Sequence, residues 1–160
     1  MRISFDLDDT LFVSEKKFNT ERAPRFPFNL LYKERLRQGT VGLMEKLRDA
    51  GIEVWIYTTS FRSERYIRAL FALYGIRPDA VVNGERHARE VQGRRREAMP
   101  SKYPSKYKID LHIDDDVSVL QNGGTYGCRV LIVGEQDDAW TEKILREIEK
   151  IQAIKQRNGG

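Results

Sequence analysis

The chain opens with the stretch ISFDLDDTL at residues 3–11, in which an apolar run ends in three acids within four positions. Ile3 to Leu7 has the length and composition of a buried strand, but like charges placed so close together repel one another. Asp6 and Asp8 are two positions apart, so on an extended strand their side chains point to one side. A bound divalent cation would remove the repulsion, and the alternative is an acidic turn in which Thr10 caps the next segment.

A second apolar run ends in the same way. Ile109 to Ile113 predicts a strand, and Asp114, Asp115 and Asp116 follow it directly. Carboxylate oxygens are the ligands that Mg²⁺ prefers, with water and substrate phosphate completing its coordination. Two acidic strand ends in one small chain are hard to explain as turns alone, although we interpret Asp116 as the start of the next turn.

Hydroxyl groups follow a third apolar run, at residues 55–57, where Thr58, Thr59 and Ser60 come in succession. A hydroxyl at a strand end, just before a helix begins, forms a corner that binds phosphate. Thr58 is the stronger candidate because it comes first after the strand, and Thr59 is the second. We interpret Ser60 as a helix cap.

Strand-like and helix-like segments alternate along the chain, which predicts an α/β fold with a parallel sheet and helices on both faces. The expected strands are 3–7, 52–57, 80–82, 109–113 and 129–133, and the expected helices are 40–50, 63–74 and 138–156. Gly159 and Gly160 at the end should fray.

Two segments do not fit the alternation, namely residues 13–38 and 83–101. Both follow strand ends, where the loops of an open α/β sheet build a binding site. Each is shorter than the roughly 40 residues that an independent cap needs, so we expect one domain over residues 1–160 with an open site. Exposed apolar groups are costly, so the cluster of Phe26, Phe28, Leu30 and Leu31 should pack on the core or on a second subunit.

Composition favours an ordinary soluble domain: the 160 residues are 40% hydrophobic and carry a net charge of +4. No apolar run approaches the roughly 20 residues of a membrane span, and the first residues predict a strand rather than a signal peptide. Cys128 is the only cysteine, so no internal disulfide forms, which suits the cytoplasm. Eight of residues 86–108 are Lys or Arg, either as a solvated loop or as a rim that attracts anions.

The order of these motifs resembles that of the haloacid dehalogenase (HAD) superfamily. The residues at 6–10, DLDDT, match its signature of Asp, any residue, Asp, any residue, Thr. Thr58 matches its second motif, and the Asp114-Asp115 pair matches its fourth. The third motif is a lysine before the fourth strand, for which Lys102 is the best match and Lys106 and Lys108 are alternatives.

The resemblance implies a three-layer Rossmann-like fold with the sheet order 5-4-1-2-3 and Asp6 on the central strand. It implies that Asp6 attacks phosphorus to form an aspartyl-phosphate and that Asp8 transfers protons. Mg²⁺ would be held by the Asp6 carboxylate, the Asp8 carbonyl and an acid of the Asp114-Asp115 pair, with Asp115 favoured. Thr58, Thr59 and Lys102 would bind the phosphoryl oxygens.

Three functions stay open at this point. The first is hydrolysis of small phosphate monoesters, and the second is removal of phosphate from a nucleic-acid end or a protein, for which the open site and the basic bias give weak support. The third is a non-catalytic module that binds magnesium and phosphate. The substrate and the oligomeric state do not follow from these residues, because specificity resides in loops.

Overall fold

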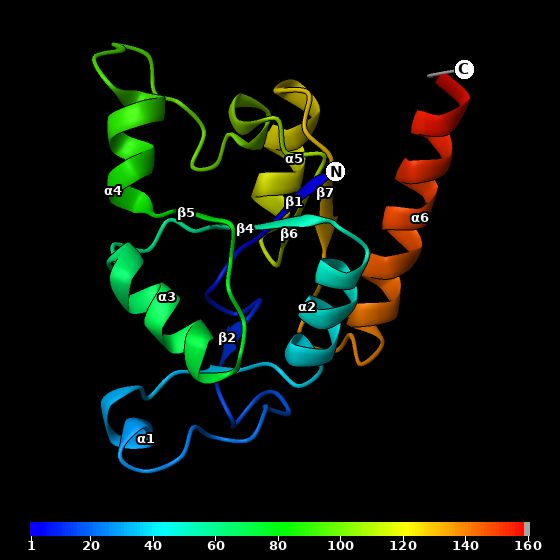
Figure 1. Ribbon diagram of the computed structural model, residues 1–160. Coiled ribbons are helices and arrows are strands. Elements are labelled where there is room, and N and C mark those ends of the chain that lie inside the picture. The colour runs from blue at the N-terminus through cyan, green and yellow to red at the C-terminus, as the bar shows by residue number, and fades with distance from the viewer. Residues whose placement is uncertain (159–160) are drawn as a thin grey trace.

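The centre of the computed structural model, which describes residues 1–158, is a parallel sheet of five strands (Figure 1). Its strands lie in the order β5-β4-β1-β6-β7. Their bounds are β1 Arg2–Phe5, β4 Glu53–Tyr57, β5 Ala80–Val82, β6 Leu111–Asp114 and β7 Val130–Ile132. The fraying expected for Gly159 and Gly160 lies outside the described residues.

The labels β5-β4-β1-β6-β7 differ from the expected numbering 5-4-1-2-3 because two additional short strands, outside the main sheet, precede β4 in the chain. These are β2 (Phe12–Val13) and β3 (Arg35–Leu36), which pair with each other in antiparallel fashion outside the main sheet. Among the five strands of the main sheet, numbered in chain order, the neighbours run 5-4-1-2-3 from β7 to β5.

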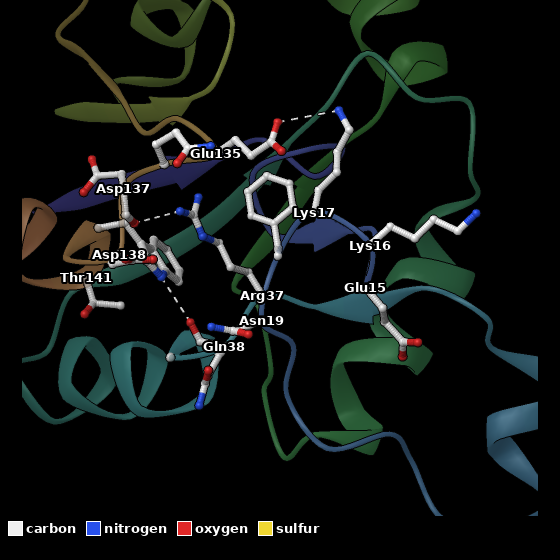
Figure 2. Close-up of a pocket in the computed structure, with 14 residues that line it drawn as sticks. Glu15, Lys16, Lys17, Asn19, Arg37, Gln38, Glu135, Asp137, Asp138 and Thr141 are labelled. Atoms are coloured by element: carbon white, nitrogen blue, oxygen red, sulfur yellow. Dashed lines mark hydrogen bonds and ion pairs between the residues drawn. The ribbon is translucent and has the colours of Figure 1, made fainter.

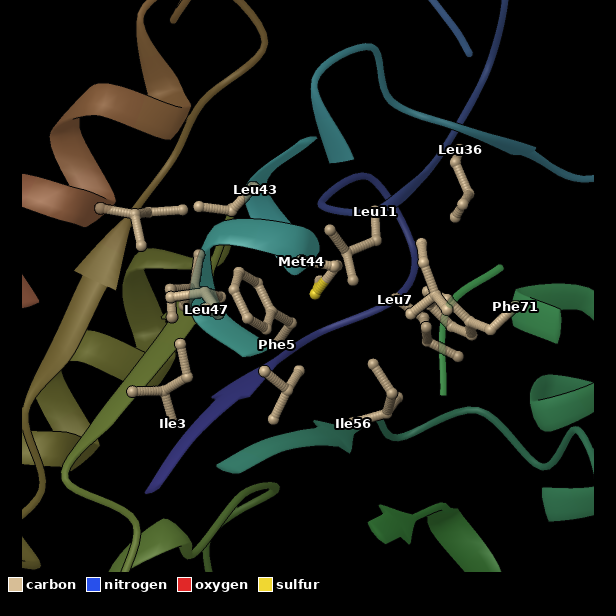
Figure 3. Close-up of a cluster of buried hydrophobic side chains, with 14 of the residues drawn as sticks. Ile3, Phe5, Leu7, Leu11, Leu36, Leu43, Met44, Leu47, Ile56 and Phe71 are labelled. Atoms are coloured by element: carbon tan, nitrogen blue, oxygen red, sulfur yellow. The ribbon is translucent and has the colours of Figure 1, made fainter. Parts of the chain in front are cut away.

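One face of the sheet is covered by α2 (Thr40–Asp49), α3 (Glu64–Leu73) and α6 (Trp140–Asn158), which bury an apolar cluster against it (Figure 3). Ile3 and Phe5 of β1 point into this cluster, and both are fully buried. Because side chains alternate along a strand, Ser4 and Asp6 belong to the opposite face. The alternation therefore gives the central strand one apolar face and one polar face.

The polar face is covered by shorter elements. These are α4 (Gly84–His87), a π-helical turn (Ala88–Gln92), a 3-10 turn (Pro104–Tyr107) and α5 (Val117–Thr125). Their apolar residues form a second, smaller cluster around Tyr57, Val91 and Tyr107. None of the helices within residues 1–158 combines the length and apolar character that crossing a membrane requires.

Helix α5 was not expected from the sequence, because Gly123 and Gly124 disfavour helix. Gly123 has a packing role instead. A Cβ atom there would lie 2.8 Å from the Cys128 carbonyl oxygen and 2.8 Å from the Val130 side chain, so only glycine lets α5 lie this close to β7.

The two irregular segments pack on the sheet. The first insertion (residues 13–38) carries the one-turn helix α1 (Phe28–Leu31) and places Leu36 in the main core, whereas the second insertion (residues 83–101) places Val91 in the smaller cluster. The expectation that the apolar residues near α1 pack on this chain's core is wrong. The exposed fractions are 78% for Phe26, 44% for Phe28, 64% for Leu30 and 68% for Leu31. Phe26 precedes α1 and the other three residues lie in it, and no residue of α1 is buried. Packing on a second subunit stays a prediction.

Candidate active site

The centre of the site is a buried lysine between two buried carboxylates. Strand register aligns Phe5 with Ile56 on one side and with Ile113 on the other, so Asp6 and Asp114 end neighbouring strands at the same edge. Lys102 reaches this edge from just beyond the second insertion. Its Nζ lies 2.7 Å from Asp6 Oδ1 and 2.5 Å from Asp114 Oδ2, and all three residues are at most 6% exposed.

The charge states of these groups follow from burial and from each other. Burial raises the pKa of Asp6 to about 6, although the Lys102 ammonium opposes this rise, so Asp6 is mostly ionised at pH 7. Burial also acts against ionised Asp114, but hydrogen bonds from His112 and Lys102 outweigh it and lower its pKa to about 2. Burial lowers the pKa of Lys102, but the two carboxylates raise it more, so this lysine stays charged.

Asp114 contacts a chain of two buried polar groups, His112 and Ser4, which was not predicted from the sequence. His112 Nε2 lies 2.8 Å from Asp114 Oδ2, and His112 Nδ1 lies 2.8 Å from Ser4 Oγ. Burial lowers the pKa of His112, so the ring is neutral and orients Asp114 without adding charge. The period of two along β6 places His112 and Asp114 on one face, and that signal could have revealed the pair.

A third carboxylate joins the other two. Ligand oxygens of Asp6, Asp114 and Asp115 lie within 4.8 Å of one another. Asp115 Oδ1 accepts a hydrogen bond of 3.1 Å from the Thr10 hydroxyl, which links the two acidic strand ends directly. Lys102 supplies one positive charge to three acids, and such close carboxylates repel unless more positive charge is present.

The residues present fit a hard divalent cation. Asp6 Oδ1 is buried and accepts no well-directed hydrogen bond from any residue in 1–158, although Lys102 is close. Both Asp114 oxygens are already in use, because Oδ2 contacts Lys102 and His112 and Oδ1 accepts from the Asp116 backbone at 2.9 Å. Asp6 and Asp115 are therefore the side chains best able to offer an oxygen to a metal such as Mg²⁺.

Asp8 lies apart from this cluster. Its side chain is 51% exposed, and its Oδ2 lies 3.0 Å from Arg62 Nη1. Its carboxylate does not belong to the group of Asp6, Asp114 and Asp115 described above. From the sequence, Arg62 could reach a substrate because it follows Thr58, and a solvated helix face is at least as good an interpretation.

Thr58 follows the last residue of β4 and is 1% exposed. Its Oγ1 accepts a hydrogen bond of 3.1 Å from the Ser60 backbone, which closes a tight corner, whereas Thr59 is exposed. Gly84, at the start of α4, lies against this corner. A Cβ atom at Gly84 would be 2.5 Å from the Thr59 carbonyl oxygen, so the close approach requires glycine.

The alternative lysines do not reach the carboxylates. Lys106 donates to the Glu90 carbonyl on the surface, and Lys108 is exposed. His87 is half-buried, with its Nδ1 2.6 Å from the Tyr57 hydroxyl. Asp116 caps α5 by accepting from the Ser118 backbone at 2.7 Å, which is the turn role expected for it.

A pocket of about 460 Å³ lies near the end of β7, between the chain after β2 and the start of α6 (Figure 2). Arg37 crosses it, with its guanidinium between the rings of Phe18 and Trp140 and its Nη2 donating to the Asp137 carbonyl at 2.8 Å. Asp6, Asp114 and Asp115 do not line this pocket. It is therefore distinct from the candidate site.

Comparison of the chain with protein-family models gives no match, and comparison with curated proteins gives none either. Any function proposed for the chain therefore depends on the arrangement of the residues themselves.

Proposed function

We propose that this chain is a magnesium-dependent phosphate monoester hydrolase of the HAD superfamily that works through an aspartyl-phosphate on Asp6. The observation that carries the proposal is the gathering of three carboxylates, from Asp6, Asp114 and Asp115, around the single ammonium of Lys102. The motif order of the HAD resemblance, from residues 6–10 through Thr58 and Lys102 to residues 114–115, supports it.

Mg²⁺ would be held by the Asp6 carboxylate, the Asp8 backbone carbonyl and the Asp115 carboxylate. Asp114 fits a supporting role better, because its oxygens are already occupied by Lys102, His112 and the backbone of Asp116. When bound, the ion supplies positive charge to the phosphoryl oxygens.

The chemistry proceeds in two displacements. An Asp6 oxygen attacks phosphorus, the bond from phosphorus to the ester oxygen breaks, and Asp8 gives its proton to the departing oxygen. Water then attacks phosphorus while Asp8 takes up its proton. The Asp6–phosphorus bond breaks, which releases inorganic phosphate and restores the carboxylate.

The remaining groups bind the phosphoryl oxygens. Lys102 offsets their charge and keeps Asp6 ionised, and the Thr58 hydroxyl and the Thr59 backbone form the corner at the end of β4. A preorganised cation in a buried site stabilises developing charge far more than the same cation does in water.

The test is replacement of the nucleophile. Asp6→Asn keeps the size of the side chain and removes the attacking charge, so we expect phosphate release to fall by at least about a thousandfold with the fold intact. The assay is release of 4-nitrophenol and inorganic phosphate from 4-nitrophenyl phosphate, with Mg²⁺ and with EDTA.

Asp9→Asn is the matched control, because Asp9 is exposed in the same loop and its φ of 56° is a conformation that asparagine tolerates. This control should keep turnover within a few-fold of wild type. Unchanged turnover in folded Asp6→Asn would exclude Asp6 as the nucleophile. Binding of Mg²⁺ and phosphate without hydrolysis of any ester would favour the non-catalytic module.

A second candidate substrate is a phosphorylated nucleic-acid end. The observation that favours it is the exposed run of Arg94, Arg95 and Arg96 at the tip of the second insertion. Contacts to backbone phosphates would make KM for a 5′- or 3′-phosphorylated oligonucleotide rise steeply with salt, while KM for 4-nitrophenyl phosphate changes little. Equal salt dependence for the two substrates would exclude this candidate.

A further inference from the structure

Within residues 1–158, Arg62 is the one basic side chain that contacts the carboxylate of Asp8. Its Nη1 lies 3.0 Å from Asp8 Oδ2, and its Nε lies 3.2 Å from Glu34 Oε1. Glu34 belongs to the first insertion, whereas Arg62 precedes α3, so the contact joins segments that are distant in sequence.

Arg62 is fixed from several directions. Its Nη1 also donates to Ser60 Oγ at 2.8 Å, and its carbonyl oxygen accepts from Asn83 Nδ2 at 3.0 Å. Glu34 in turn accepts a short hydrogen bond from the hydroxyl of Tyr66, which lies in the first turn of α3. The guanidinium is thus held at both its backbone and its side chain, which limits the rotamers open to it.

Asp8, in contrast, has little else to hold its side chain. The carboxylate is half-exposed, and among residues 1–158 its only side-chain partner is Arg62. Asp9, which follows it, turns the chain away with a positive φ of 56°. An exposed carboxylate without a partner samples several rotamers, whereas proton transfer needs one orientation.

We infer that Arg62 and Glu34 are positioning residues for Asp8, with Glu34 fixing the guanidinium and the guanidinium fixing the carboxylate. This inference rests on the proposed function, since it assigns Asp8 the proton transfers. The first insertion then contributes to the site through the anchored carboxylate of Glu34. Ion pairs as exposed as these contribute little to stability, so the arrangement is better explained by alignment than by folding.

A nested set of double mutants tests the order of action. Arg62→Ala should lower kcat for 4-nitrophenyl phosphate on the order of tenfold to a hundredfold, because a misplaced proton-transfer group loses alignment. Glu34→Gln should lower kcat by a smaller factor. If Arg62 acts through Asp8, then Arg62→Ala should have no further effect in the Asp8→Asn background, and Glu34→Gln should have none in the Arg62→Ala background.

Glu15→Gln is the matched control. Glu15 lies in the same insertion and pairs with Arg35 at 3.2 Å, so its replacement breaks a similar pair away from Asp8 and should leave kcat at the wild-type value. Arg62→Lys should restore part of the activity, because it keeps one donor but loses the two-sided contact.

The possible outcomes distinguish a failure of this inference from a failure of the proposed hydrolase function. Losses from Arg62→Ala that persist in full in the Asp8→Asn background would show that Arg62 acts on its own, as a substrate ligand or as part of the fold, and would overturn the inference. Turnover of Asp8→Asn can be too slow to measure. In that case, the inference would also be overturned if Glu34→Gln lowers kcat in the Arg62→Ala background by the same factor as in wild type. Absence of any Mg²⁺-dependent phosphate release from wild type would instead overturn the proposed function.

Discussion

Replacing Lys102 with methionine tests the centre of the site, because it leaves Asp6 and Asp114 buried without their shared cation. Methionine fills much of the same volume, so the change is chiefly one of charge. The folded variant can limit the damage by taking up a proton on Asp6. That uptake costs about 1.4 kcal/mol for each pH unit above the ordinary carboxyl pKa of 3.8.

Wild type already bears about 3 kcal/mol of this cost at pH 7, because the pKa of Asp6 is about 6 there, so the expected further loss of unfolding free energy is about 1.4 kcal/mol at pH 7 and close to zero at pH 5. The sign follows from linkage. A carboxyl whose pKa is raised by folding binds its proton more tightly in the folded state, so stability falls as pH rises from the unfolded toward the folded pKa. For a chain of this size, the loss at pH 7 corresponds to a fall in Tm of about 3–6 °C.

Urea and thermal unfolding followed by circular dichroism, in EDTA at both pH values, measure this loss. Lys106→Met is the matched control, because Lys106 is an exposed lysine of the neighbouring turn, and it should change stability by less than about 0.5 kcal/mol. If metal-free Lys102→Met is as stable as wild type at pH 7, Lys102 does not lie between the carboxylates and the charge balance described for the site is wrong. Adding Mg²⁺ should recover part of the loss, because the ion replaces the missing positive charge.

Other changes give separate tests. Asp8→Asn should lower turnover by roughly 10²–10⁴ and leave the Mg²⁺ affinity near wild type, because its backbone carbonyl is the expected ligand; loss of Mg²⁺ binding in calorimetric titration would contradict this division of roles. Asp115→Ala should weaken Mg²⁺ more than Asp114→Ala in the same titration, and the reverse order would exchange their roles. Gly84→Ala should lower stability by about 1–3 kcal/mol, because its Cβ would lie 2.5 Å from the Thr59 carbonyl. Gly124→Ala, with open space at its Cβ in helix α5, should instead be neutral or stabilising in the same unfolding assay.

The sequence predicted the sheet and its acidic edge because both depend on short-range pattern. Runs such as Val54–Tyr57 are apolar throughout, as strands buried on both faces must be, and residues directly after such runs lie at the carboxyl edge. Helix α5 was not predicted because Gly123 allows a close contact with β7 that only the folded chain reveals.

The site could be predicted only in part, for a related reason. Asp6, Asp114 and Asp115 follow strands, so strand register alone brings them together. Other contacts in the site join residues that are distant in sequence. Arg62 meets Asp8 because of the path of a loop, and His112 meets Ser4 across two strands, so neither contact leaves a local signature.

The segment that carries Lys102 affects how the chain unfolds locally. This lysine follows an irregular basic stretch that lacks regular secondary structure over residues 93–103, so the stretch can open without disturbing the sheet. Each opening would pull the ammonium away from Asp6 and leave the carboxylates unbalanced, which raises the free energy of that opening. Amide exchange along the stretch should therefore be slower in wild type than in a variant whose Asp6 carries no charge. The loop that carries Lys102 would thus be held in place by the carboxylates that this lysine contacts.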